Sequence, residues 1–427
     1  MRILIVSEDI PYPSMGGLAK HALTLARALV RAGHRVDILG GSQHPIEAAG
    51  EEGKFGGRFF GELDGHIAGW KEIPLGLYLP PRRTWIARRF ARIILRFAPR
   101  YDVIHYHGHV PNVARYIPEY VNFVQTRHDQ GGDCLINTRF RDGEICSSVD
   151  PSDCARCRTA QPNALQTAVS SIAVKRYRAE VADAFRRHKT VFVSDMVQRN
   201  FARAMGPGPW GATVHNFVDL NSIRRARNAT AATAAASATS AAPAASSAAR
   251  PGLFQVFVAA KLYPAKGIEP FLREVAGIMP SNMRISIAGD GADEERLRNE
   301  FENAQIRFLG WCSMEKTLEL AAAANAIVVP SVWEEPCGTT ILEALMLGKP
   351  TFALARGGTP ELAIYAAAPE QLRLHPDLPS LVRDLAAFVP RPDYDMRADG
   401  AGGAERAAQR LLEIYRLPPG PAAAHSH

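Results

Sequence analysis

The chain has 427 residues, of which 47% are hydrophobic and 22% charged, a composition that excludes a disordered or fibrous protein. A chain of this length is too long to fold around one ordinary hydrophobic core, and it fits two α/β domains with a tail. The formal net charge of +7 favours anionic partners such as a nucleotide diphosphate or an anionic membrane, but it is too small over this length to indicate nucleic acid.

The N-terminus, MRILIVSEDI, is too short and too acidic for the apolar core of a secretion signal. No stretch approaches the roughly 18 to 20 continuous apolar residues that span a bilayer. We therefore expect a cytoplasmic protein, with peripheral contact at the inner face of the membrane as an alternative.

The first half of the chain predicts a parallel sheet covered on both faces. A buried strand at residues 3–6 is followed by a Gly/Pro-rich turn, a helix over 21–33 that ends at a glycine, and a second strand over 34–41. Further β-rich runs at 101–109, 122–129 and 189–196 each end where polar residues begin. Ligand sites of such sheets lie at the carboxyl ends of the strands.

A basic segment over 84–100, TWIARRFARIILRFAPR, has the periodicity of an amphipathic helix. Two interpretations stay open: the helix covers the sheet with its arginines in water, or it docks on anionic lipid. One face carries the apolar residues Ile86, Phe90, Ile93, Ile94 and Phe97.

Four of the six cysteines fall in one short stretch directly after His128. Disulfides are disfavoured in the cytoplasm, and the last two cysteines form a CxxC pair with metal-ligand spacing. We expect either a structural zinc site or a set of reduced thiols in a loop. The candidate zinc ligands are Cys134, Cys146, Cys154 and Cys157.

Residues 228–250 are almost entirely Ala, Ser and Thr, which predicts a flexible or irregular insertion between domains. A second series of strands follows over 253–259, 283–288, 306–310, 326–331 and 349–354, with helices between. An amphipathic helix near 401–417 closes the pattern. The second half thus repeats the architecture of the first.

The most informative stretch is VVPSVWEEPCGTTILEALMLGKP, in which a buried strand, a polar turn and a helix follow one another. The turn carries Glu335, and Glu343 lies in the first turns of the helix. Backbone amides of Gly338, Thr339 and Thr340 would open that helix, and a helix N-terminus is a natural phosphate site. The alternative is two ordinary early-helix glutamates, which the helix dipole favours.

This stretch resembles the Glu-x7-Glu signature of glycosyltransferase family 4, the group 1 retaining enzymes of the GT-B fold. The segments SMGG, RHD, VHNFVD, AAKLYPAKG, AGDG and RFLGW also match, in the same order. The resemblance implies two Rossmann-like, doubly wound α/β domains that face each other across a cleft. The expected parts are an acceptor-side domain over 1–220 with a Cys-rich loop at 130–160, an inter-domain insertion over 221–250, a donor domain over 251–416 and a disordered tail over 417–427. As an alternative boundary, the last helix crosses back to the first domain.

The resemblance also implies residue roles. Glu335 would contact the donor sugar, Glu343 the ribose, and Lys261 with Lys266 the diphosphate, while His128 would lie near the sugar. The family usually has Gly-Arg where this chain has Ala260 and Lys261, so the bidentate grip of arginine is lost. Cys337 also replaces the usual Phe. The implied catalytic set is His128, Glu335, Lys261 and Lys266, and the implied donor-binding set is Gly16, Gly17, Lys261, Lys266, Gly338, Thr339, Thr340 and Glu343.

The sequence therefore predicts a retaining hexosyltransferase of class EC 2.4. It would move a sugar from a UDP-, GDP- or ADP-sugar to a glycan, lipid-linked or other acceptor in cell-surface polysaccharide or glycoconjugate synthesis. No cofactor is expected for catalysis, since no DxD-type metal arrangement lies near the site. The competing hypotheses are a nucleotide-sugar epimerase of similar architecture and a non-catalytic scaffold.

Overall fold

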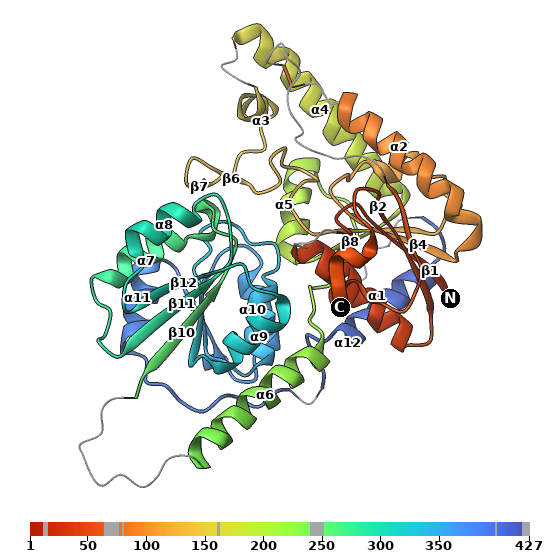
Figure 1. Cartoon of the computed structure of the whole chain (residues 1–427). Coiled ribbons are helices and arrows are strands. Elements are labelled where there is room, and N and C mark those ends of the chain that lie inside the picture. Colours follow the sequence, from red (N-terminus) through yellow and green to blue (C-terminus); the bar gives the residue numbers. More distant parts are fainter. Residues whose placement is uncertain are drawn as a thin grey trace, which may run out of the picture. The chain divides into compact units, whose positions relative to one another are not determined.

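The computed structural model describes residues 1–11, 16–63, 77–78, 81–159, 163–239, 252–397 and 399–420. The chain divides into two compact units. Unit 1 comprises Met1–Arg139, Cys146–Asn216 and the described residues from Ala404 onward; unit 2 comprises Phe140–Ile145 and Phe217–Gly403. Each unit contains a parallel sheet with helices around it (Figure 1).

The sheet of unit 1 has seven parallel strands in the order β3-β2-β1-β4-β5-β8-β9. In that order the strands are Phe59–Leu63, Arg35–Gly41, Arg2–Ser7, Val103–His107, Phe123–Arg127, Lys189–Phe192 and Ala212–Thr213. The side chains of residues 3–6 in the central strand β1 have no exposed surface. A strand buried on both faces reads as a continuous apolar run, as the sequence predicted.

The helices of unit 1 are α1 (Gly17–Arg31), α2 (Pro81–Phe97), α3 (Pro151–Arg158), α4 (Ala164–Arg187), α5 (Asp195–Met205) and α12 (Ala404–Arg416). Unit 1 also contains three 3-10 turns, Ile46–Gly53, Ala98–Arg100 and Val113–Tyr116. The short strands β6 (Phe140–Arg141) and β7 (Glu144–Ile145), which belong to unit 2, pair in an antiparallel ladder. The C-terminal helix α12 packs on α1, where Arg31 and Glu405 form an ion pair of 2.7 Å.

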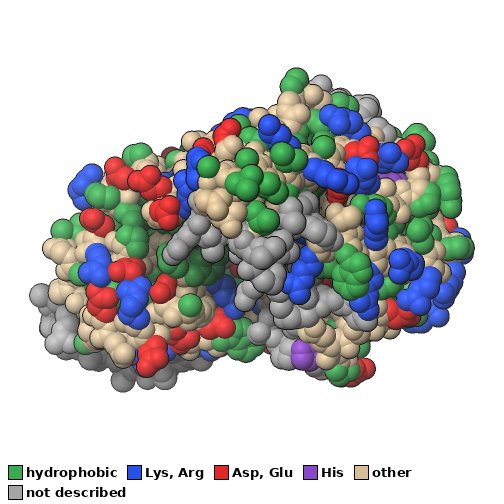
Figure 2. All heavy atoms as spheres, turned by 90° about the horizontal axis from the view of Figure 1, so that it is seen from above, with side chains coloured by type: hydrophobic (Ala, Val, Ile, Leu, Met, Phe, Trp, Pro, Cys, Tyr) green, Lys and Arg blue, Asp and Glu red, His purple; other side chains and the backbone are tan. Residues whose placement is uncertain are grey.

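The basic segment forms α2, and its apolar side chains are buried against unit 1. The helix packs on β3 and on the turn Val113–Tyr116, so the sheet-covering interpretation is correct. Its exposed side includes Arg88, Arg92 and Arg96. Figure 2 shows one face of the molecule, where Lys and Arg side chains are prominent over the right-hand part that belongs to unit 1. None of the described helices is both long and apolar enough to cross a membrane.

The sheet of unit 2 has six parallel strands in the order β12-β11-β10-β13-β14-β15. In that order they are Ile306–Gly310, Met283–Ala288, Phe254–Ala259, Ala326–Val329, Thr351–Leu354 and Leu372–His375. The helices are α6 (Leu220–Thr239), α7 (Ile268–Ala276), α8 (Glu294–Phe301), α9 (Met314–Ala323), α10 (Thr339–Met346) and α11 (Leu378–Ala387), with 3-10 turns at Pro264–Lys266, Thr359–Tyr365 and Pro369–Gln371. In Figure 1, α7 and α8 lie on one face of this sheet and α9 and α10 on the other.

The Ala/Ser/Thr-rich stretch departs from the sequence prediction. Residues 228–239, predicted to belong to a flexible or irregular insertion over 228–250, are part of the helix α6. Alanine is the strongest helix former, and the helix finds a packing face through the buried Ile223 and Ala226, which lie upstream of the low-complexity run. Helix α6 packs on α9. Residues 240–251 lie outside the described part of the chain, as do residues 421–427 of the predicted disordered tail.

Candidate functional site

The centre of the candidate site in unit 2 is an ion pair between Lys266 and Glu335, which are 69 residues apart in sequence. The Lys266 Nζ lies 2.9 Å from Glu335 Oε1 and 2.6 Å from Oε2. Both side chains are largely buried, with 16% and 14% of their surface exposed. The structure thus joins two of the four residues that the sequence predicted to be catalytic.

The fold creates this contact by packing one loop at a strand end against another. After β10 the chain makes a short turn that ends at Lys266, and Gly267 adopts a left-handed φ of 69° before α7 begins. A Cβ on Gly267 would lie 2.1 Å from the carbonyl oxygen of Pro330, just beyond β13. The Val332 amide donates to the Ala265 carbonyl at 3.0 Å. Only glycine permits this approach, which brings the lysine beside the acidic turn.

Glu335 accepts further hydrogen bonds from the side chains of its own loop. The Ser331 hydroxyl lies 3.1 Å and the Trp333 indole nitrogen 2.9 Å from its Oε2. Burial opposes ionisation of the carboxyl, but the Lys266 ammonium and these hydrogen bonds outweigh it and hold the pKa of Glu335 below its usual value. Burial likewise opposes the charge on Lys266, yet Glu335 raises its pKa above the usual value. Both groups are therefore charged at neutral pH.

Lys261 does not join this pair. Its Nζ forms a separate ion pair of 2.6 Å with Asp290 at the end of the neighbouring strand β11, and half of the lysine side chain is exposed. The cation is therefore free to rearrange at low cost, because an exposed ion pair contributes only about 0 to 1 kcal/mol. The carboxylate of Asp290 is a partner that the sequence analysis did not identify.

The acidic turn leads directly into α10, as predicted. Gly338 caps the helix, and Thr339 and Thr340 are its first two residues. The first amides of a helix have no partner within it and face the space before the helix. Glu343 is the fifth residue of α10 and is partly buried. Gly357, with φ of 61°, packs against the Glu335 backbone, and the Gly358 amide donates to the Glu335 carbonyl at 2.8 Å.

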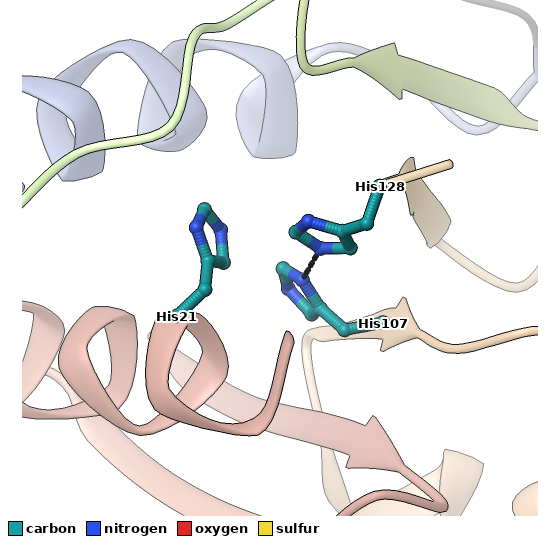
Figure 3. Close-up of side chains that lie close together, drawn as sticks. All are labelled: His21, His107 and His128. Carbon is teal, nitrogen blue, oxygen red and sulfur yellow. Dashed lines mark hydrogen bonds between the residues drawn. The ribbon is translucent and has the colours of Figure 1, made fainter. Parts of the chain in front are cut away.

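In unit 1, His128 follows β5 and lies in a cluster of imidazoles. His128 Nε2 is 2.9 Å from Nδ1 of His107, the last residue of β4, and the ring of His21 on α1 lies 4.5 Å from the His128 ring (Figure 3). Burial lowers the pKa of His21 to about 3 and those of His107 and His128 well below the usual value. The three rings are neutral at physiological pH.

A second network holds the residue after His128. Asp129 accepts from Arg127 at 3.0 Å, from the Gly131 amide at 2.8 Å and from His109 Nδ1 at 3.1 Å. The other nitrogen of His109 lies 3.1 Å from Asp9. Burial disfavours the imidazolium of His109, but hydrogen bonds to these two carboxylates raise its pKa well above the usual value.

Gly16 and Gly17 open α1 at the carboxyl end of β1, the position expected for a glycine turn. Gly16 caps the helix in an extended conformation, and a Cβ on either glycine would have no described atom within 4 Å. No described protein atom therefore requires glycine at either position.

The zinc site predicted on the four cysteines stays a prediction. None of the four forms a disulfide, and among the described residues only His21, His107 and His128 form a metal-compatible group of three or more side chains. Cys154 accepts a hydrogen bond of 3.1 Å from Arg178, and burial raises the pKa of Cys134 to about 11.

Sequence reasoning missed Ser331, Trp333, Asp290, His21, His107 and His109. A signal was present for His107: it alternates with His105 in β4, and alternate residues of a strand share one face. His21 lies on a helix near the glycine turn and carried no readable pattern.

Two family models match the chain. The model described as "Glycosyltransferase Family 4" matches residues 15–222, and the model described as "Glycosyl transferases group 1" matches residues 244–367. Among curated proteins, glycogen synthase of Mycobacterium tuberculosis is 24% identical over 97% of this chain and 91% of its own length. An uncharacterized glycosyltransferase of Methanocaldococcus jannaschii is 30% identical over 25% of this chain and 28% of that protein.

Solved structures show the same fold at low identity. HepE of Anabaena in complex with UDP superposes with a TM-score of 0.56 at 16% identity, covering 98% of this chain and 96% of that one. Sucrose-phosphate synthase of Thermosynechococcus elongatus has a TM-score of 0.58 at 17% identity, covering 97% and 98%. Two Rossmann-type parallel sheets in separate units, together with these neighbours, define the two-domain GT-B fold. The chain is therefore a group 1 glycosyltransferase that resembles family 4.

Proposed function

We propose that this glycosyltransferase is a retaining hexosyltransferase that takes its sugar from a nucleotide-sugar donor. The observation that carries the proposal is the buried Lys266–Glu335 pair beside the start of α10. A lysine ammonium and free helix amides are the groups that stabilise a diphosphate, and a carboxylate accepts hydrogen bonds from sugar hydroxyls. Structures of Anabaena HepE in complex with UDP and with UDP-glucose support a nucleotide-sugar donor by analogy.

The chemistry follows from where charge develops. As the sugar–phosphate bond loosens, negative charge grows on the leaving diphosphate and positive charge on the anomeric carbon. Lys266, Lys261 and the amides of Thr339 and Thr340 would stabilise the first, and Glu335 would stabilise the second. The acceptor hydroxyl attacks from the side that the diphosphate leaves, which retains the anomeric configuration, and the diphosphate takes the acceptor proton.

Glu343 and the histidine site complete the assignment. A carboxylate within α10 suits the ribose diol of the nucleotide, and Gly16 and Gly17 at the start of α1 leave room for a diphosphate. His128 is neutral and would exchange a hydrogen bond with the transferred sugar. The acceptor is proposed to be a glycan, a lipid-linked sugar or another glycoconjugate in the synthesis of a cell-surface polysaccharide, on the cytoplasmic side of the membrane.

The test starts with the donor. Thermal-shift measurements with UDP, GDP and ADP should show stabilisation by one nucleotide, because a ligand that binds only the folded state raises its stability. The matching nucleotide sugars are then assayed for transfer or slow hydrolysis, with the anomeric configuration of the product read by NMR.

Two variants and a matched control test whether Lys266 and Glu335 are required for transfer. Lys266→Ala and Glu335→Gln should each lower turnover by about 10² to 10³, the loss typical for one group that stabilises transition-state charge. Lys316→Ala removes a lysine from an exposed ion pair with Glu319 on α9 of the same unit and should leave turnover unchanged. Wild-type turnover in either site variant would contradict the proposal. Conversion of the donor to another nucleotide sugar would indicate an epimerase, and absence of nucleotide binding would indicate a scaffold.

A further inference from the structure

The histidine cluster of unit 1 has a geometry that donor binding does not require. His21, His107 and His128 come from α1, β4 and the loop after β5, and one ring nitrogen of each lies within 4.8 Å of the other two (Figure 3). Their ring centroids are 4.5 Å apart for His21 and His128, 5.2 Å for His107 and His128, and 5.4 Å for His21 and His107. The three imidazoles converge on one point.

The neighbouring His105 shows what a purely structural histidine looks like in this strand. Its Nδ1 lies 2.6 Å from the Tyr415 hydroxyl and its Nε2 lies 2.7 Å from the Thr126 hydroxyl, so both nitrogens are satisfied. His107 is equally buried, yet its Nε2 has no hydrogen-bond partner among the described residues. Buried polar atoms in native proteins almost always have partners, so the fold does not satisfy the His107 ring as it satisfies that of His105. The other nitrogen of His107, Nδ1, lies 2.9 Å from His128 Nε2, and this unmet capacity beside two further imidazoles favours a ligand-binding role.

We propose that His21, His107 and His128 bind a divalent transition-metal ion of the zinc class, and that this ion inhibits sugar transfer rather than supporting it. Imidazole nitrogen is a preferred ligand of zinc, copper and nickel, and three histidines with an open fourth position form a known zinc geometry. The ion would draw the three rings together and leave one position for water.

The distances fit such an ion after a small movement. With zinc–nitrogen bonds of about 2.0 to 2.1 Å and tetrahedral angles, two ligand nitrogens lie roughly 3.3 Å apart. Nδ1 of His107 and Nε2 of His128 are 2.9 Å apart, so this pair of nitrogens is already near that spacing. The widest pair of the three is no more than 4.8 Å apart, so rotation of the side-chain rings can close the difference.

The position of His128 explains why a bound metal would inhibit transfer. This inhibitory role, unlike the metal site itself, rests on the proposed function. The same imidazole is proposed to bond the transferred sugar, and a nitrogen that holds a metal cannot also bond a hydroxyl. The metal and the sugar would therefore compete for one side chain. In the proposed function His128 contacts the sugar. A metal ion bound to the same imidazole would abolish that contact.

The experiment measures metal binding directly, on the full chain freed of metal with EDTA and then freed of EDTA. Zinc chloride is titrated into the protein in a calorimeter, and cobalt chloride is added in a parallel sample to record the visible absorption of a bound ion. The wild-type protein should bind one equivalent of zinc. His21→Gln and His107→Gln should each weaken that binding by more than about 100-fold, because loss of outer-shell partners alone costs 10- to 100-fold.

His44→Gln is the matched control, since His44 belongs to unit 1 but lies outside the cluster. His425 and His427 near the C-terminus are identical in all variants, so any binding there cancels in the comparison. Circular dichroism in EDTA checks that each variant folds, and His21→Gln tests the site independently should the fully buried His107 fail to tolerate glutamine. Equal zinc affinity in the wild type and folded His21→Gln would overturn the proposal.

Transfer assays complete the test. Zinc should inhibit the wild-type enzyme, with recovery on EDTA addition, and should inhibit His44→Gln equally. Stoichiometric zinc that leaves the transfer rate unchanged would overturn the inhibitory role. Zinc binding by a protein that has no transfer activity would support the metal site and contradict the proposed function. Transfer activity without zinc binding would support the proposed function and contradict the metal site.

Discussion

The Nζ of Lys266 lies 2.6 Å from Oε2 of Glu335, and each is the main charged partner of the other. Neither side chain is free in the absence of ligand. In the proposed function, a diphosphate that engages the ammonium would compete with the carboxylate, and the carboxylate would turn to a sugar hydroxyl. The ion pair therefore keeps the two largely buried charges compensated in the absence of a ligand.

Removal of one partner should destabilise unit 2 more than removal of both. Lys266→Met leaves a largely buried carboxylate without its cation, which should cost on the order of 2 kcal/mol, less than the 3–5 kcal/mol of a fully buried pair. The double variant Lys266→Met, Glu335→Gln should recover part of this loss. Thermal unfolding of the single and double variants measures the interaction energy between the two side chains. The same double-mutant cycle on the exposed Lys316–Glu319 pair is the control, and its interaction energy should be near zero.

The acid stability of the protein should depend on Glu335. Its pKa in the folded state lies below the ordinary value of 4.5, so its ionisation stabilises the fold above pH 4.5, and this contribution is lost as the pH falls through the folded pKa. Glu335→Gln should therefore show a shallower loss of stability than the wild type below pH 4.5. Unfolding midpoints measured from pH 6 to about pH 3 give the two slopes. Parallel curves would contradict the lowered pKa.

Tyr415 should stabilise unit 1 through His105. Its hydroxyl lies 2.6 Å from His105 Nδ1 in a fully buried contact between α12 and β4. Tyr415→Phe leaves the imidazole nitrogen unpaired, which should cost about 1 to 3 kcal/mol. Denaturation with urea measures the loss. Tyr120→Phe removes the same group from a side chain that is 82% exposed and should have no effect.

Gly357 should be intolerant of a side chain. It has a φ of 61°, and a Cβ there would lie 2.5 Å from the Glu335 amide nitrogen. Gly357→Ala must displace the loop that holds Glu335, so we expect a loss of turnover of at least about tenfold, the equivalent of 1.4 kcal/mol. Gly277→Ala adds the same methyl group where φ is −76° and the nearest atom is 3.8 Å away. It should behave as the wild type in the transfer assay.

Local patterns of apolar and turn residues in the sequence predicted much of the architecture. Apolar runs bounded by turn residues predicted the central strands of both sheets, and the segments before and after Gly338 predicted a turn followed by α10. Periodicity works here because a parallel strand buried on both faces and an amphipathic helix each leave a regular mark on the chain. The irregularity predicted for residues 228–250 was wrong for residues 228–239, because helix propensity and buried side chains upstream determine that segment.

The sequence by itself determined the two-sheet α/β architecture, the family resemblance, and the identity of Glu335, Lys266 and His128 as candidate site residues. The tertiary structure decided their partners: Lys266 pairs with Glu335, Lys261 pairs with Asp290, and His128 lies beside His21 and His107. These contacts join residues far apart in the chain. Their geometry depends on how strand-end loops pack in space, and no local pattern of residues encodes that packing.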